Sequence, residues 1–110
     1  MIKNSVGVLP LIEIDTPYLD GSFNILTILH ESCFMLRYIN RSNKDIFISY
    51  NGRELHDIIP AQDSVQLLFN NKIGSQLGGF MYKDTTIYGS CVSNAKGSLY
   101  ISGYYFIAGR

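Results

Sequence analysis

Residues 46–69 read IFISYNGRELHDIIPAQDSVQLLF, and this stretch decides the fold class. Its last six residues place Val65, Leu67 and Phe69 on one face of a strand, alternating with more polar positions. Its first five residues, 46–50, follow the same period of two. A period of two is the pattern of a strand with one buried face. We therefore predict a strand at each end of the stretch.

Two turn signals divide this stretch. Asn51-Gly52 tolerates positive φ at both positions, which suits a type I′ turn into a strand at residues 53–59. The sequence Pro-Ala-Gln-Asp at residues 60–63 is typical of a second turn. Short strands separated by turns at this spacing predict an all-β sandwich or barrel.

Further short runs lie outside the central stretch. Residues 85–91 and 98–107 are predicted as the closing strands, and residues 79–82 as a short piece of strand. In the run 8–14, Ile12 and Ile14 face inward and Glu13 and Asp15 outward. Pro10 confines the first half of that run to an edge position or an extended arm.

Residues 23–40 fit two interpretations. Ile25 and Leu29 lie near helical spacing, whereas residues 34–39 alternate as a strand does. Periodicity alone does not choose between helix and strand in short apolar runs. We favour two strands with residues 30–32 as the loop between them.

The closing strand is apolar on both faces. Leu99, Ile101, Tyr105 and Ile107 mark one face, and Tyr100, Tyr104 and Phe106 mark the other. Such a strand is either covered by its own loops or packs against another subunit, since tyrosine and phenylalanine are enriched in interfaces. The candidate interface residues are therefore Tyr100, Tyr104 and Phe106 on this strand, together with Leu9 and Leu11 in the N-terminal arm.

Composition excludes several classes of protein. Nine basic residues balance nine acidic ones in a chain of 110, which argues against nucleic-acid binding through general basicity. The chain is 46% hydrophobic and 16% charged, so disorder is not expected and association is favoured. The apolar stretch near the N-terminus is interrupted by Gly7 and Pro10, so we predict no signal peptide. No run reaches the roughly 18 apolar residues of a membrane helix, so we expect no membrane partner.

The chemistry-bearing residues are sparse. His56 and Asp57 are adjacent, with Ser49 or Ser64 as a conceivable nucleophile, but no spacing implies that these groups meet. His30-Glu31 gives no stronger signal. The remaining acidic residues are too scattered for a calcium loop, and no phosphate-binding glycine motif occurs. We predict no enzymatic activity, no metal and no cofactor.

The two cysteines and a small basic cluster do not indicate a functional site. Cys33 and Cys91 show no metal spacing and are expected to be reduced, although a disulfide between them stays open. Arg37, Arg41 and Lys44 gather around Tyr38, and we interpret them as a solvated face.

The middle and end of the chain carry an ordered set of short motifs. They are LRYINRSN at 36–43, IFISYNG at 46–52, HDIIPA at 56–61, SVQL at 64–67, TIY at 86–88 and YISGY at 100–104. This order resembles small β-sandwich virion proteins of tailed bacteriophages over roughly residues 36–106. The chain departs from the family pattern at Gln62, where the turn usually carries glycine, and at Asn51, which replaces an aspartate.

The resemblance implies a structural role in a phage particle. It suggests a single antiparallel β-sandwich over residues 1–110, jelly-roll-like, with about seven or eight short strands and residues 1–15 as an arm or edge strand. The implied function is capsid decoration, head–tail connection or a tail-associated role. The implied partners are other copies of the chain and a larger capsid, portal or tail protein, in a virion made in the host cytoplasm. The alternative is a receptor- or glycan-binding module of a host-attachment device.

Overall fold

The computed structural model describes residues 5–69, 81–92 and 94–107, and these build an all-β sandwich of two antiparallel sheets. The elements are β1 (Ser5–Val8), β2 (Ile12–Asp15), the short 3₁₀ turn η1 (Thr16–Tyr18), β3 (Asn24–Ile28), β4 (Met35–Asn40), β5 (Ile46–Ser49), β6 (Asp57–Ile59), β7 (Ser64–Leu68), β8 (Thr86–Cys91) and β9 (Ser98–Ile107). The predicted fold class is confirmed.

The strand order is that of a jelly roll. One sheet, called here the β9 sheet, runs β1–β9–β4–β7, and β2 also pairs with β9. The other, the β8 sheet, runs β3–β8–β5–β6. Because β1 and β2 pair with successive parts of β9, they form one edge strand that is interrupted between them. Counted so, the eight strands have the orders 1-8-3-6 and 2-7-4-5, the double Greek key of a jelly roll.

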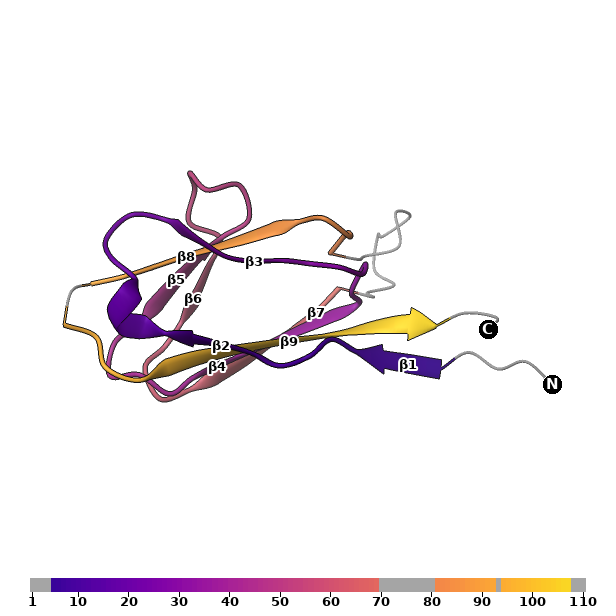
Figure 1. Ribbon diagram of the computed structural model, residues 1–110, viewed down its shortest axis with the longest axis horizontal. Coiled ribbons are helices and arrows are strands. Elements are labelled where there is room, and N and C mark those ends of the chain that lie inside the picture. The colour runs from indigo at the N-terminus through magenta and orange to yellow at the C-terminus, as the bar shows by residue number, and fades with distance from the viewer. Residues whose placement is uncertain (1–4, 70–80, 93, 108–110) are drawn as a thin grey trace.

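The core lies between the two sheets, which Figure 1 shows as two stacked layers. Leu36 and Tyr38 of β4 and Leu99 and Ile101 of β9 are buried on the inner side of the β9 sheet. Burial alternates along β4, as the period of two requires. From the β8 sheet, Ile46, Ile48 and Ile87 close the core.

Residues 1–15 were predicted as an arm or an edge strand. Residues 5–8 and 12–15 pair with β9 as an edge strand, and residues 1–4 lie outside the described ranges. Ile12 and Ile14 point inward and Glu13 and Asp15 outward, as expected. The interruption between β1 and β2 falls at Pro10, which has no N–H to give to a sheet. The segment at 23–40 forms the two predicted strands, β3 and β4, with residues 30–32 between them.

The prediction of a tight turn at Asn51-Gly52 is wrong. Gly52 has φ +79°, but Asn51 does not have positive φ, so the turn is not type I′. Instead, residues 50–56 form a wider loop, and only Asp57–Ile59 pair with β5. The reason is side-chain capping: Asn51 Oδ1 accepts hydrogen bonds from the N–H groups of Arg53 and Glu54, at 2.9 and 3.0 Å.

A short strand was also predicted at 79–82, and the described residues of that range, 81 and 82, do not form one. Met81 makes a single antiparallel bridge with Cys33, and residues 79 and 80 lie outside the described ranges. The turn at 60–63 is confirmed, and Gln62 has φ +60° in it. Glycine adopts that left-handed conformation without steric cost, so it would also fit this position.

Candidate functional site

The outer face of the β9 sheet carries a row of apolar side chains. Val8 lies opposite Tyr104, Tyr104 opposite Met35, and Met35 opposite Leu68. Residues that are directly paired across strands point to the same face of a sheet. The row therefore crosses all four strands on the side away from the core.

A second apolar row lies beside the first. Val6 is paired with Phe106, and the ring of Phe34 stacks on that of Phe106 with centroids 4.3 Å apart. Both rows together form what we call the apolar patch, which consists of Val6, Val8, Phe34, Met35, Leu68, Tyr104 and Phe106. Its most exposed members are Leu68 at 64%, Val8 at 54% and Val6 at 53%.

The other end of the same face is polar. Glu13 is paired with Tyr100, and its carboxylate accepts hydrogen bonds from Ser98 Oγ at 3.0 Å and from the Tyr100 hydroxyl at 3.4 Å. Tyr100 in turn is paired with Ile39, whose partner on β7 is Ser64. The outer face is thus divided into an apolar end at β1 and a polar end at β2.

The five predicted interface residues separate between these regions. Tyr104 and Phe106 belong to the apolar patch, and Tyr100 belongs to the polar end. Leu11 is 58% exposed and lines a shallow hollow with Tyr100 and Arg41. Leu9 instead packs against the core, so its side chain serves the fold.

Sequence reasoning missed five members of the patch. Val6 and Val8 lay in the apolar N-terminal stretch, but only the pairing of β1 with β9 places them beside Phe106 and Tyr104. Leu68 carried a usable signal, since it is the apolar exception on the polar face of an alternating strand. Phe34 and Met35 gave none, because their neighbours in space come from β7 and β9, which lie far along the chain.

The patch reaches a free sheet edge. β1 is the last strand of the β9 sheet on its side, so among the described residues nothing pairs with its outer edge. Edge strands present N–H and C=O groups that another chain can pair with. An apolar face and an available edge therefore adjoin at this end of the molecule.

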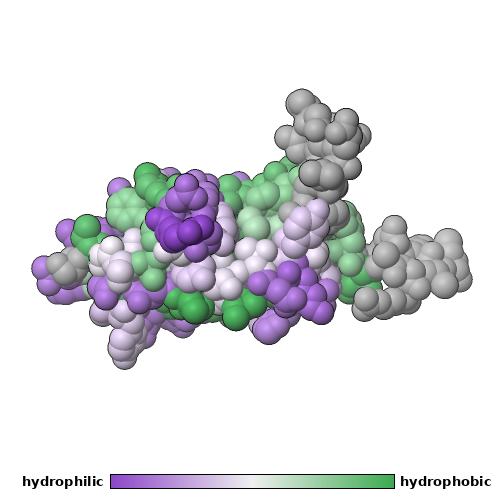
Figure 2. Space-filling view, turned by 90° about the horizontal axis from the view of Figure 1, so that it is seen from above, coloured by the Kyte–Doolittle hydropathy of each residue, from purple (hydrophilic) through white to green (hydrophobic). Residues whose placement is uncertain are grey.

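The outer face of the β8 sheet is different. The loop after β5 projects over it, and a Cβ on Gly52 would lie 3.1 Å from the Tyr88 ring. Figure 2 looks onto this side and shows apolar areas separated by a hydrophilic projection. The exposed apolar residues Ile25, Ile28 and Ile58 do not form rows like those of the β9 sheet, because each row across these strands also contains a polar residue, namely Ser49, Thr86 or Ser90.

The residues considered for catalysis are engaged elsewhere. His56 Nδ1 accepts a hydrogen bond from the Tyr50 N–H at 3.0 Å, and Asp57 Oδ2 accepts one from the Tyr50 hydroxyl at 2.9 Å. Ser49 Oγ donates to Asn51 Oδ1, and Ser64 lies on the outer face of the other sheet. The structure therefore does not bring His56, Asp57 and a serine into a catalytic arrangement.

The acidic residues, the cysteines and the basic cluster do not form a site among the described residues. Within residues 5–69, 81–92 and 94–107, no three His, Cys, Asp or Glu side chains are grouped so that they could hold a metal ion. Cys33 and Cys91 are buried free thiols, and burial raises the pKa of both, that of Cys33 to about 11. Tyr38 is fully buried, so it does not share a surface with Arg37 and Arg41.

Comparison with known proteins gives no relative. No protein-family model, curated protein or solved structure matches this chain. The described residues also contain no helix with the length and apolar character needed to cross a membrane.

Proposed function

We propose that this chain is a non-enzymatic structural subunit of a tailed-phage virion that docks through the apolar patch. The observation that carries the proposal is the pair of apolar rows on the outer face of the β9 sheet, next to the free edge of β1. The resemblance of residues 36–106 to small virion sandwiches of tailed phages supports the proposed place in a virion. The jelly-roll topology agrees with it, because viral capsid domains often use this fold.

The size of the patch suits a repeated weak contact. Val6, Val8, Leu68 and Phe106 expose between 44% and 64% of their surface. Even the largest apolar patch on an ordinary monomer covers only roughly 300–600 Å². A stable pairwise interface needs about 800 Å² from each partner. We therefore expect single contacts to be weak and to gain strength through many copies on a larger capsid, portal or tail protein.

Immunogold electron microscopy tests whether the chain is part of a phage particle. An antibody against the folded chain should label tailed particles at regular positions on the head, neck or tail. If the chain is absent from every particle fraction, the proposal is wrong. If it instead depletes from solution onto host cells or a glycan array, the host-attachment function takes its place.

The surface itself is tested by a charged substitution in the patch. Val8→Lys places an ammonium group in the first apolar row, where docking would bury it without a partner. We expect the wild-type chain to self-associate between about 10 μM and about 1 mM in sedimentation velocity, and the variant to stay monomeric.

A matched control lies on the opposite sheet. Ile25 is also an exposed outward-facing residue on an edge strand, and it is paired with Tyr88. Ile25→Lys should leave association unchanged. Equal loss in both variants, or unchanged association in Val8→Lys, would contradict docking through the patch.

A further inference from the structure

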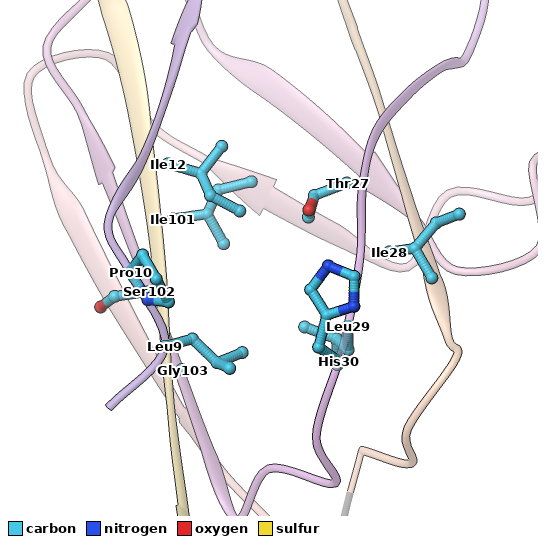
Figure 3. A pocket seen from close by; sticks show the side chains of 10 residues that line it. All are labelled: Leu9, Pro10, Ile12, Thr27, Ile28, Leu29, His30, Ile101, Ser102 and Gly103. Atoms are coloured by element: carbon cyan, nitrogen blue, oxygen red, sulfur yellow. The ribbon is translucent and has the colours of Figure 1, made fainter. Parts of the chain in front are cut away.

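A pocket of about 240 Å³ opens on the side of the sandwich where the edge strands of the two sheets face each other. Figure 3 shows one wall formed by the interruption between β1 and β2 together with the middle of β9. The opposite wall is the end of β3 and the residues that follow it. The pocket lies between the sheets, away from the outer face that carries the apolar patch.

Both edge strands are irregular where they border the pocket. The first strand is interrupted at residues 9–11, and β3 has a register shift between Ile25 and Thr27. Bulges and breaks bend a strand and end its regular pairing, so the two edges do not close against each other here. The opening is therefore produced by the backbone, and it does not depend on one small side chain.

The lining is apolar on the inner side. Leu9, Ile12 and Ile101 extend from one wall towards the other, and Leu29 lies on the far side (Figure 3). The hydroxyl of Ser102 points away from the pocket in the same view. An interior of this kind disfavours a charged ligand, because burial without a countercharge is costly.

Two polar side chains stand at the β3 wall. Thr27 and His30 both lie towards the pocket (Figure 3), and neither side chain makes a hydrogen bond to any described residue. A hydroxyl and an imidazole offer both donors and acceptors. They can therefore bind one polar group on a ligand that is otherwise apolar.

We propose that this pocket binds a small uncharged molecule of one or two rings that carries one hydroxyl or equivalent group. An apolar protein cavity of about 150 Å³ accepts benzene, so the larger pocket here has room for a substituted or bicyclic ring. The ring would contact Leu9, Ile12 and Ile101, and its polar group would bond to His30 or Thr27. This inference is independent of the proposed virion role.

Titration of the full chain with phenol, benzene and indole tests the proposal by methyl NMR. Phenol and indole should shift the methyl signals of Ile12, Leu29 and Ile101 in a saturable way, with dissociation constants of about 1 mM or tighter. Signals of Ile46 and Ile48, which are buried core residues of β5, should not move. Absence of saturation up to about 10 mM would overturn the proposal.

Two variants connect binding to the pocket. Ile12→Phe fills the space and should abolish binding of all three probes. His30→Ala changes an exposed side chain, so the fold should persist, and phenol should bind roughly three- to tenfold more weakly while benzene is unaffected.

His56→Ala is the matched control, because His56 lies on the loop after β5 and should not change the affinity of any probe. Binding that survives Ile12→Phe would place the ligand elsewhere and overturn the proposal. If Ile12→Phe does not fold, His30→Ala alone tests the proposal. Its affinity for phenol should then fall while its affinity for benzene does not. An equal loss of affinity for both probes would overturn the assigned polar contact.

Discussion

Tyr50 links the two sheets through polar contacts of its side chain. Its hydroxyl lies 2.8 Å from the hydroxyl of Tyr38 on β4 and donates to Asp57 Oδ2 on β6 at 2.9 Å. Burial raises the pKa of both tyrosine hydroxyls above their ordinary value. In surroundings of low polarity, such a chain of hydrogen bonds is costly to leave half-formed.

Removing that hydroxyl should destabilise the protein. Tyr50→Phe leaves the Tyr38 hydroxyl without its partner, and we expect the free energy of unfolding to fall by about 1–3 kcal/mol. Urea denaturation measures the change. Tyr18→Phe is the control, because Tyr18 is 83% exposed and its substitution should cost little. Equal stability of the two variants would contradict the role of the link.

Cys33 should make the stability depend on alkaline pH. Its thiol has a pKa of about 11 in the folded chain, against an ordinary value of 9.0, because burial penalises the thiolate. Between these values the folded state binds more protons than the unfolded state, so stability falls as pH rises through this window. The advantage of the wild type over Cys33→Ala should therefore shrink between pH 8 and pH 11 in urea denaturation. A stability difference between the two proteins that stays constant over this pH range would contradict the raised pKa of the thiol.

At the level of elements, the connection before β9 depends on one glycine. Gly97 has φ +120°, and a Cβ there would overlap the carbonyl oxygen of Arg41. Its own carbonyl oxygen accepts hydrogen bonds from the N–H and the hydroxyl of Thr16, both at 3.0 Å. The start of β9, the turn after β2 and the end of β4 therefore meet at this position.

Gly97→Ala should be strongly destabilising. The strained backbone and the overlap with Arg41 together are expected to cost more than about 2 kcal/mol. Thermal unfolding followed by circular dichroism measures the loss. Gly21→Ala is the matched control, since a Cβ there meets nothing within 4 Å and the change should stay within about 0.5 kcal/mol. A small effect at Gly97 would mean that this connection rearranges freely.

The elements themselves were largely predictable. The closing strand was predicted at 98–107, the bounds of β9, because both of its faces are apolar and Gly97 precedes it. The strand at 53–59 was overestimated, since the capping by Asn51 competes with strand pairing and is not visible in an apolar pattern. The division at 23–40 was correct, although only pairing with β8 and β9 distinguishes β3 and β4 from a helix.

In the whole molecule, β9 is the central strand of its sheet. It pairs with β1, β2 and β4, which come from the first forty residues. Among the described strands, only β5 and β6 pair with a neighbour in sequence. Non-local pairing of this kind slows folding, because long loops must close before any contact is gained.

This topology predicts how truncation acts. A chain that ends at residue 97 lacks β9 and should be unfolded by circular dichroism. A chain that starts at residue 9 lacks only β1 and should still unfold cooperatively, because β2 keeps its pairing with β9. A folded chain without β9 would show that the β8 sheet is stable alone.

The sequence by itself determined the local structure: the strand class, most strand positions, the turn at 60–63 and the inward direction of Ile12 and Ile14. These depend on side-chain alternation and on backbone preferences, which are properties of neighbouring residues. Only the tertiary structure decided that Tyr104 and Phe106 join Val6 and Val8 in one patch while Tyr100 lies with Glu13. The reason is that a surface is assembled from strands that are far apart in sequence, and the register that aligns them is set by hydrogen bonding across the sheet.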